Sequence, residues 1–161
     1  MKRMRMLLAL GLATAGVAGL AACTHEQPSL ALNPQYRLAY DDKGETVALA
    51  YGLPNSDDVA LMLECAKGSG QVELSDTLRD KRATAIVLFS DGKKTSVPVR
   101  SEANEVDGEA ILTGRLPLSA PALQGLRRTG VLQVSGGQAR YTVAVAAGGR
   151  VAVERFFKAC G

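Results

Sequence analysis

The chain has 161 residues, of which 47% are hydrophobic and 22% are charged, and its formal net charge is +3. That charge comes from the start of the chain, because removing Lys2, Arg3 and Arg5 from the 19 basic residues leaves 16, which balance the 16 acidic residues. A neutral remainder without tryptophan or a long basic cluster argues against a nucleic-acid-binding protein, and its roughly 140 residues suffice for one hydrophobic core but not for two.

The first 22 residues are organised like an export signal. The basic start is followed by an apolar run from Met6 to about Gly19, and small residues stand before Cys23. The motif Leu20-Ala21-Ala22-Cys23 resembles the lipobox of bacterial lipoproteins. That resemblance implies that residues 1–22 are a cleaved signal peptide and that Cys23 becomes the lipidated N-terminus, whose palmitate-type chains hold the protein on a membrane.

Two other interpretations of this segment stay open. A plain secretory signal could contain a cysteine, and an uncleaved helix could span a membrane, although the stretch from Met6 to Ala22 does not exceed the roughly 20 apolar residues that a span needs. In the enterobacterial pattern, an aspartate after the lipidated cysteine retains a lipoprotein at the inner membrane, and this chain has Thr24 there. The resemblance therefore implies a periplasm-facing protein of the cell envelope, on the outer membrane.

The next segment is expected to be a tether. Residues 23–35 contain Pro28 and Pro34 and show little hydrophobic periodicity. Ten such residues reach about 30 Å when extended. Residues 36–161 then form one β-rich envelope domain.

Short apolar alternations predict that most of this domain consists of β-strands. Residues 85–90 are apolar on both faces, which is typical of a central strand, and the turn at Asp91-Gly92 leads into a strand from Thr95 to Arg100. Because Pro98 has no N–H to donate, we expect that strand at a sheet edge. Further strands are predicted over residues 47–51, 59–65, 72–74, 109–116, 131–134 and 139–146, which gives seven or eight strands in all.

Two helices complete the prediction. The first covers residues 120–128, with Ser119 as the N-cap, Pro121 in the first turn and Gly130 just past the end. The second begins near Arg150 and ends the chain. Hairpin strands with few helices predict a mainly β fold, either an antiparallel β-sandwich or a partly open barrel, with a short helix and a C-terminal helix.

Cys65 and Cys160 are expected to form a disulfide. Once Cys23 carries lipid they are an even pair in an oxidising compartment. Cys65 continues the apolar alternation of residues 59–65, and Cys160 continues the i, i+3, i+4, i+7 pattern that begins at Val153. Both cysteines are therefore expected on buried faces. A redox-active pair is disfavoured because neither thiol is in a CxxC motif.

The sequence offers little catalytic chemistry. Its only histidine, His25, lies in the tether, which removes Ser-His-Asp and Cys-His arrangements and makes a histidine-based zinc site improbable. The cluster at residues 55–58 and the carboxylates between Glu102 and Glu109 are interpreted as solvated loops, and Lys67-Gly68-Ser69-Gly70 is interpreted as a hairpin turn. We therefore expect no metal, no cofactor and no enzymatic activity.

Two classes of function remain. The first is a non-catalytic, lipid-anchored binding or accessory module whose partner is an envelope protein or a glycan, and it predicts an exposed apolar or aromatic patch near Tyr36, Tyr40 or Tyr51. The second rests on the order of Cys65-x-x-Gly68, the segment from Ser135 to Tyr141 and a terminal cysteine, which resembles the membrane-bound lysozyme inhibitors of Gram-negative bacteria. That resemblance implies inhibition of a lysozyme-type enzyme, with Ser135 and Tyr141 as contact residues.

Overall fold

The computed structural model describes residues 29–77, 82–103, 110–137, 139–146 and 148–161. Within these ranges the chain forms nine strands and two helices. The elements in chain order are β1 (Arg37–Asp42), β2 (Thr46–Gly52), β3 (Val59–Ala66), β4 (Gln71–Asp76), β5 (Ala85–Ser90), β6 (Lys93–Ala103), β7 (Ala110–Pro117), α1 (Pro121–Thr129), β8 (Val131–Gly136), β9 (Ala139–Ala144) and α2 (Gly149–Cys160).

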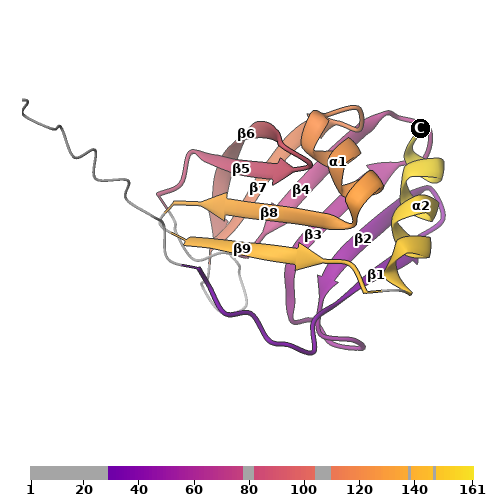
Figure 1. Ribbon diagram of the computed structural model, residues 1–161. Coiled ribbons are helices and arrows are strands. Elements are labelled where there is room, and N and C mark those ends of the chain that lie inside the picture. Colours follow the sequence, from indigo (N-terminus) through magenta and orange to yellow (C-terminus); the bar gives the residue numbers. More distant parts are fainter. Residues whose placement is uncertain (1–28, 78–81, 104–109, 138, 147) are drawn as a thin grey trace, which may run out of the picture.

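All nine strands belong to one sheet. Their order is β1-β2-β3-β4-β7-β6-β5-β8-β9, every neighbouring pair is antiparallel, and the sheet curls into a half-barrel. Figure 1 shows β5, β8 and β9 in front of β2, β3 and β4, with the two helices on one side. The mainly β prediction is confirmed, and the partly open barrel is the alternative that the chain adopts.

Strand β1 lies at one edge of the sheet and is not among the predicted strands. Only Leu38 and Tyr40 alternate there, and both are half-buried. An edge strand that covers part of the core needs few apolar residues, so its periodicity is weak.

The concave side of the sheet holds the hydrophobic core. Side chains alternate along each strand, so that every second one points inward. The predicted inward face of β3 is confirmed, because Leu61, Leu63 and Cys65 are all buried. Val153, Phe156, Phe157 and Cys160 of α2 are buried as predicted too. The core therefore lies between the curled sheet and the two helices.

The prediction that Pro98 marks an edge strand is wrong. β6 lies between β5 and β7. The N–H of Val99 donates to the carbonyl oxygen of Thr84 at 3.0 Å, so the nitrogen of Pro98, one residue earlier, faces the side of β7. Pairing with β7 begins only at Val99, opposite Gly114. Pro98 is tolerated because it lies where β6 begins to pair with its second neighbour.

Helix α1 begins one residue later than predicted. Ala120 occupies the N-cap position without a side-chain hydrogen bond, so the prediction of a Ser119 cap is wrong. Instead, Thr95 of β6 accepts a hydrogen bond from the N–H of Ala122 at 3.1 Å, and a neighbouring strand thus satisfies one free donor of the first turn. The predicted end is confirmed: Gly130 has a φ of 73° and its N–H donates to Leu126.

Gly125 lets α1 approach β5 closely. A Cβ at this position would lie 2.7 Å from the Ser90 hydroxyl and 2.8 Å from the Ser90 carbonyl oxygen. We expect Gly125→Ala to lower the free energy of unfolding by about 1 to 2 kcal/mol, because this clash with backbone outweighs the gain in helix propensity. Urea unfolding measures the loss. Gly148→Ala is the control: its Cβ meets nothing within 4 Å, and the change should stay below about 0.5 kcal/mol.

The predicted disulfide joins β3 to the last turn of α2. Cys65 and Cys160 are bonded, with 5.8 Å between their Cα atoms. The turn between β3 and β4 adds two hydrogen bonds, from Gly68 N–H to the Ala159 carbonyl and from Gly70 N–H to the Cys160 carbonyl, both 2.8 Å long. Carbonyl groups at the end of a helix otherwise lack partners, so this turn caps α2 while the disulfide holds it on the sheet.

Part of the segment assigned to the tether lies against the domain. Ser29 forms a parallel bridge with Arg140 of β9, and the N–H of Leu30 donates to the Arg140 carbonyl at 2.7 Å. Leu32 packs against the core. Residues 23–28 of the expected tether lie outside the described residues.

Candidate functional site

The convex side of β5, β8 and β9 carries the most distinctive surface among the described residues. We call it the β5–β8–β9 face, and its outward side chains are Val87, Phe89, Val131, Gln133, Ser135, Arg140 and Thr142. Most of them surround a half-open hollow of about 360 Å³. The hollow is lined by Ser29, Val87, Phe89, Gln133, Val134, Ser135, Arg140, Tyr141 and Thr142.

Strand register places these side chains in two rows. In the first row, Val87 lies opposite Ser135, and Ser135 lies opposite Arg140. The second row runs from Phe89 to Gln133 and on to Thr142. Residues directly opposite one another in a sheet have Cβ atoms about 5 Å apart. The face therefore combines an apolar strip on β5 with a strip of hydrogen-bonding groups on β8 and β9.

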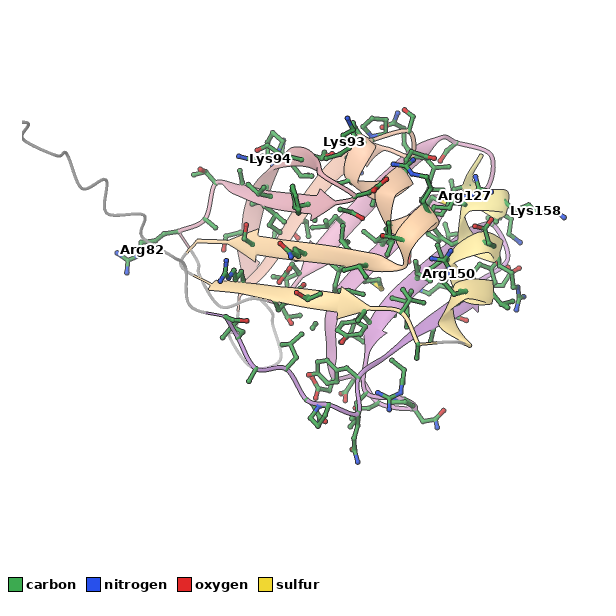
Figure 2. The ribbon with its side chains drawn as sticks, viewed as in Figure 1. Arg82, Lys93, Lys94, Arg127, Arg150 and Lys158 are labelled. Atoms are coloured by element: carbon green, nitrogen blue, oxygen red, sulfur yellow. A yellow bond between two sulfur atoms is a disulfide. The ribbon has the colours of Figure 1, made fainter. Side chains whose placement is uncertain are left out.

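The apolar strip is unusually exposed. Phe89 is 42% exposed and Val131, on the next strand, is 41% exposed. Lys94 of β6 lies opposite Phe89 and adds a cation at the rim (Figure 2). A binding partner could therefore cover the ring of Phe89 and form hydrogen bonds with the side chains of Gln133 and Thr142 through its own polar groups.

The start of the described chain closes one side of the hollow. Ser29 lines it, and the backbone bond between Leu30 and Arg140 covers the free edge of β9 at this point. An uncovered edge would offer unpaired N–H and C=O groups to any extended chain. The strand edge beside Arg140 is therefore covered, and the outward side chains remain accessible.

The two contact residues implied by the resemblance to lysozyme inhibitors lie on neighbouring strands but on opposite sides of the sheet. Ser135 is half-buried in the hollow, and its hydroxyl lies 3.5 Å from the Val87 carbonyl oxygen. Tyr141 is 1% exposed and points inward. Its hydroxyl donates a hydrogen bond of 2.7 Å to Oδ2 of Asp76, which is also fully buried. Ser135 therefore lines the hollow, whereas the side chain of Tyr141 belongs to the core.

Burial raises the pKa of the Tyr141 phenol well above its ordinary value, and the charge of Asp76 raises it further. A folded-state pKa above the unfolded value means that the unfolded chain releases this proton first. The contribution to stability is complete below about pH 10 and is lost as the pH rises above it.

We expect the absorbance of the Tyr141 phenolate at 295 nm to appear together with the loss of β-sheet circular dichroism in an alkaline titration. In Tyr141→Phe, the absorbance step that accompanies unfolding should be smaller by one phenolate, because burial also raises the pKa of Tyr51, which still ionises in that step. Ionisation of all four tyrosines while the circular dichroism remains native would contradict the assignment.

The region of Tyr36, Tyr40 and Tyr51, where an exposed apolar or aromatic patch is expected, is only partly exposed: Tyr36 and Tyr40 are half-buried and Tyr51 is buried. Tyr51 is only 8% exposed and packs edge-on against Tyr36, with ring centroids 5.7 Å apart. The Tyr36 hydroxyl donates to Asp58 at 2.6 Å. Arg155 of α2 lies 4.3 Å from the centroid of the Tyr40 ring. These rings serve packing within the domain, and the exposed ring is Phe89.

Other polar clusters of the described chain are paired among themselves. Residues 55–58 form a turn, as expected, in which Asn55 has a φ of 59°. Arg127 pairs with Glu154 and Arg128 pairs with Asp91. Within the described ranges, no three histidine, cysteine or acidic side chains gather as metal ligands would. Cys23, His25 and residues 104–109 lie outside these ranges, and Glu102, which was expected in the acidic loop, instead belongs to β6 opposite Ile111 of β7.

No protein-family model, curated protein or solved structure matches this chain. No helix among the described residues is long and apolar enough to cross a membrane. Function must therefore be argued from the residues of the chain and from their arrangement.

Proposed function

We propose that this protein is a lipid-anchored, non-catalytic module of the cell envelope that binds its partner with the β5–β8–β9 face. The observation that carries this proposal is the hollow of about 360 Å³, in which the exposed ring of Phe89 stands beside the polar side chains of β8 and β9. Pockets that bind ligands combine apolar walls with a few placed polar groups.

The composition of the face supports a binding role. Aromatic residues and arginine are enriched where proteins meet, and Phe89 and Arg140 both line the hollow. β5 and β8 are paired with a strand on each side, and all three strands pack against the core. The backbone positions that carry the outward side chains are therefore fixed before a partner binds. Little conformational entropy is then lost on binding.

The test of this face is comparative capture from envelope extracts with the tethered protein as bait. A partner should be enriched by the wild-type chain and lost with Phe89→Ala. The matched control is Val151→Ala on α2, which removes the most exposed large apolar side chain, at 64% exposure, away from the hollow. Capture that both variants weaken equally, or that neither weakens, would contradict the assignment of the face.

The anchor has its own test. Substitution Cys23→Ser should abolish acyl labelling and normal processing, because the sulfur that carries the lipid is gone. Unchanged labelling and unchanged membrane fractionation would refute the anchor and leave the binding face untouched.

The alternative function is inhibition of a lysozyme-type enzyme, and one observation favours it. The segment from Ser135 to Tyr141, which carries the resemblance, forms the β8–β9 hairpin that lines the hollow. Lysozymes cleave with two carboxyl groups, and a cation such as Arg140 could pair with them. The purified domain should then inhibit lysozyme in a cell-wall lysis assay, and Ser135→Ala and Arg140→Ala should each weaken inhibition. No inhibition by the wild-type domain would remove this alternative.

A further inference from the structure

We infer that the domain is held on the bilayer in one orientation, with the end that carries Ser29, Arg82 and the start of β9 facing the lipid surface. This inference rests on the proposed lipid anchor at Cys23. It adds which part of the domain meets the membrane and which part points away from it.

The first step is the point where the chain leaves the domain. The N–H of Leu30 is bonded to the Arg140 carbonyl at 2.7 Å, and Ser29 is bridged to the same residue. Leu32 packs against the core two residues later. These contacts fix the exit point at the start of β9.

The second step is the length of chain that remains. Five residues, Thr24 to Pro28, separate Cys23 from Ser29. Fully extended, the six steps between the two Cα atoms span about 21 Å. A flexible chain of this length averages about 13 Å between its ends. A domain of about 130 residues has a radius of gyration of about 14 Å, which corresponds to a diameter of about 35 Å. The remaining chain is too short to reach around the domain.

The third step identifies the two ends of the domain. Ile86 of β5 pairs with Gly136, and Gly136 pairs with Ala139, so β5 and β9 both start at the exit point. In Figure 1 this end lies on the left. Arg82, which precedes β5, lies there in Figure 2, whereas Arg127 of α1 and Lys158 of α2 lie on the opposite side. The turn before Lys93 follows the far end of β5, roughly 25 Å along the strand direction from Arg82.

An exposed apolar side chain supports this orientation. Leu30 is 41% exposed and stands directly beside the exit point. In this orientation the lipid surface would shield Leu30 from water, whereas an orientation with the opposite end toward the bilayer would leave it in water. A partner that binds the β5–β8–β9 face must therefore approach close to the bilayer, because Ser29 and Arg140 border both the hollow and the exit point.

The test uses the lipidated full-length protein in vesicles of phosphatidylethanolamine and phosphatidylglycerol that contain nitroxide-labelled headgroups, which quench a dye only at short range. Fluorescent dyes are attached to Arg82→Cys and Lys93→Cys, one at each end of the domain. We expect several-fold stronger quenching at Arg82→Cys. Equal quenching at both positions, or stronger quenching at Lys93→Cys, would overturn the inference.

A longer tether tests whether the shortness of the tether causes the orientation. Twenty Gly and Ser residues inserted between Gln27 and Pro28 should bring the ratio of the two quenching values close to one, and a ratio that persists would overturn the role of tether length. Flotation of the protein with the vesicles separates the two proposals. A protein that does not float refutes the anchor and with it the orientation, whereas a protein that floats and shows equal quenching refutes the orientation alone.

Discussion

Replacing both Cys65 and Cys160 with alanine is expected to lower the free energy of unfolding by about 4 to 5 kcal/mol. The disulfide closes a loop of 95 residues. On the chain-entropy model, closing a loop of that length lowers the conformational entropy of the unfolded chain by an amount that corresponds to about 4 to 5 kcal/mol. Alanine is the right replacement because both positions are buried, and a serine hydroxyl there would need a partner. Urea unfolding of the purified domain measures the difference.

The wild-type domain under reducing conditions is the control for this prediction. It should unfold at nearly the same urea concentration as the double variant, and reductant should not change the double variant itself. The fold should persist in both, because Gly68 and Gly70 still bond to the end of α2 and Phe156 and Phe157 stay in the core. A double variant within about 1 kcal/mol of the oxidised wild type would contradict the stabilising role of the disulfide.

Tyr141→Phe is expected to lower the free energy of unfolding by about 1 to 3 kcal/mol. The change removes one hydroxyl and leaves the ring in place. Asp76 then loses a donor inside the core, where water cannot replace it, and an acceptor that is charged loses more than a neutral one. Denaturant unfolding at neutral pH gives the value.

Tyr51→Phe is the matched control for this second prediction. Tyr51 is also a buried tyrosine, but burial alone raises the pKa of its phenol, and no hydrogen bond to a carboxylate contributes as it does for Tyr141. Its substitution should therefore cost well under 1 kcal/mol. If the two substitutions cost the same, the bond between Tyr141 and Asp76 contributes nothing beyond packing.

Tyr141→Phe also separates two roles of the β8–β9 hairpin. The side chain of Tyr141 is buried, whereas Ser135 lines the hollow. If a partner binds this hairpin, Ser135→Ala should weaken binding without a large loss of stability. Tyr141→Phe should lower stability and leave the affinity of the folded protein nearly unchanged.

Several features of the fold could be predicted because they depend on neighbouring residues in the chain. The inward faces of Cys65 and Cys160 follow from periodicity, and the end of α1 at Gly130 follows from the left-handed conformation that glycine readily adopts. The prediction of a Ser119 cap is wrong because the hydroxyl of Thr95, which is distant in the chain, accepts the hydrogen bond from a free N–H group in the first turn of α1. The expected edge strand failed because Pro98 lies where β6 begins to pair with β7, which no local pattern reveals.

Of the outward residues of the candidate site, only Ser135 is indicated by the sequence, through the resemblance to lysozyme inhibitors, and the rest depend on the fold. Residues 85–90 are apolar on both faces. This pattern is the one sequence signal of the apolar part of the site, because an outward Phe89 needs either a covering element or a partner. Its neighbours Gln133 and Thr142 lie more than forty positions further along the chain, and only the pairing of β5 with β8 and of β8 with β9 brings them together.

By itself, the amino-acid sequence determined the mainly β class, the disulfide pair and the end of α1 at Gly130, since these follow from local periodicity and from backbone preferences. The tertiary structure alone decided the order of the strands, the outward position of Phe89 and the inward position of Tyr141. It also decided the exit point at Ser29. The physical reason is that pairing between strands far apart in the chain depends on how the whole core packs, and neither partner's own residues specify which strand will lie beside it.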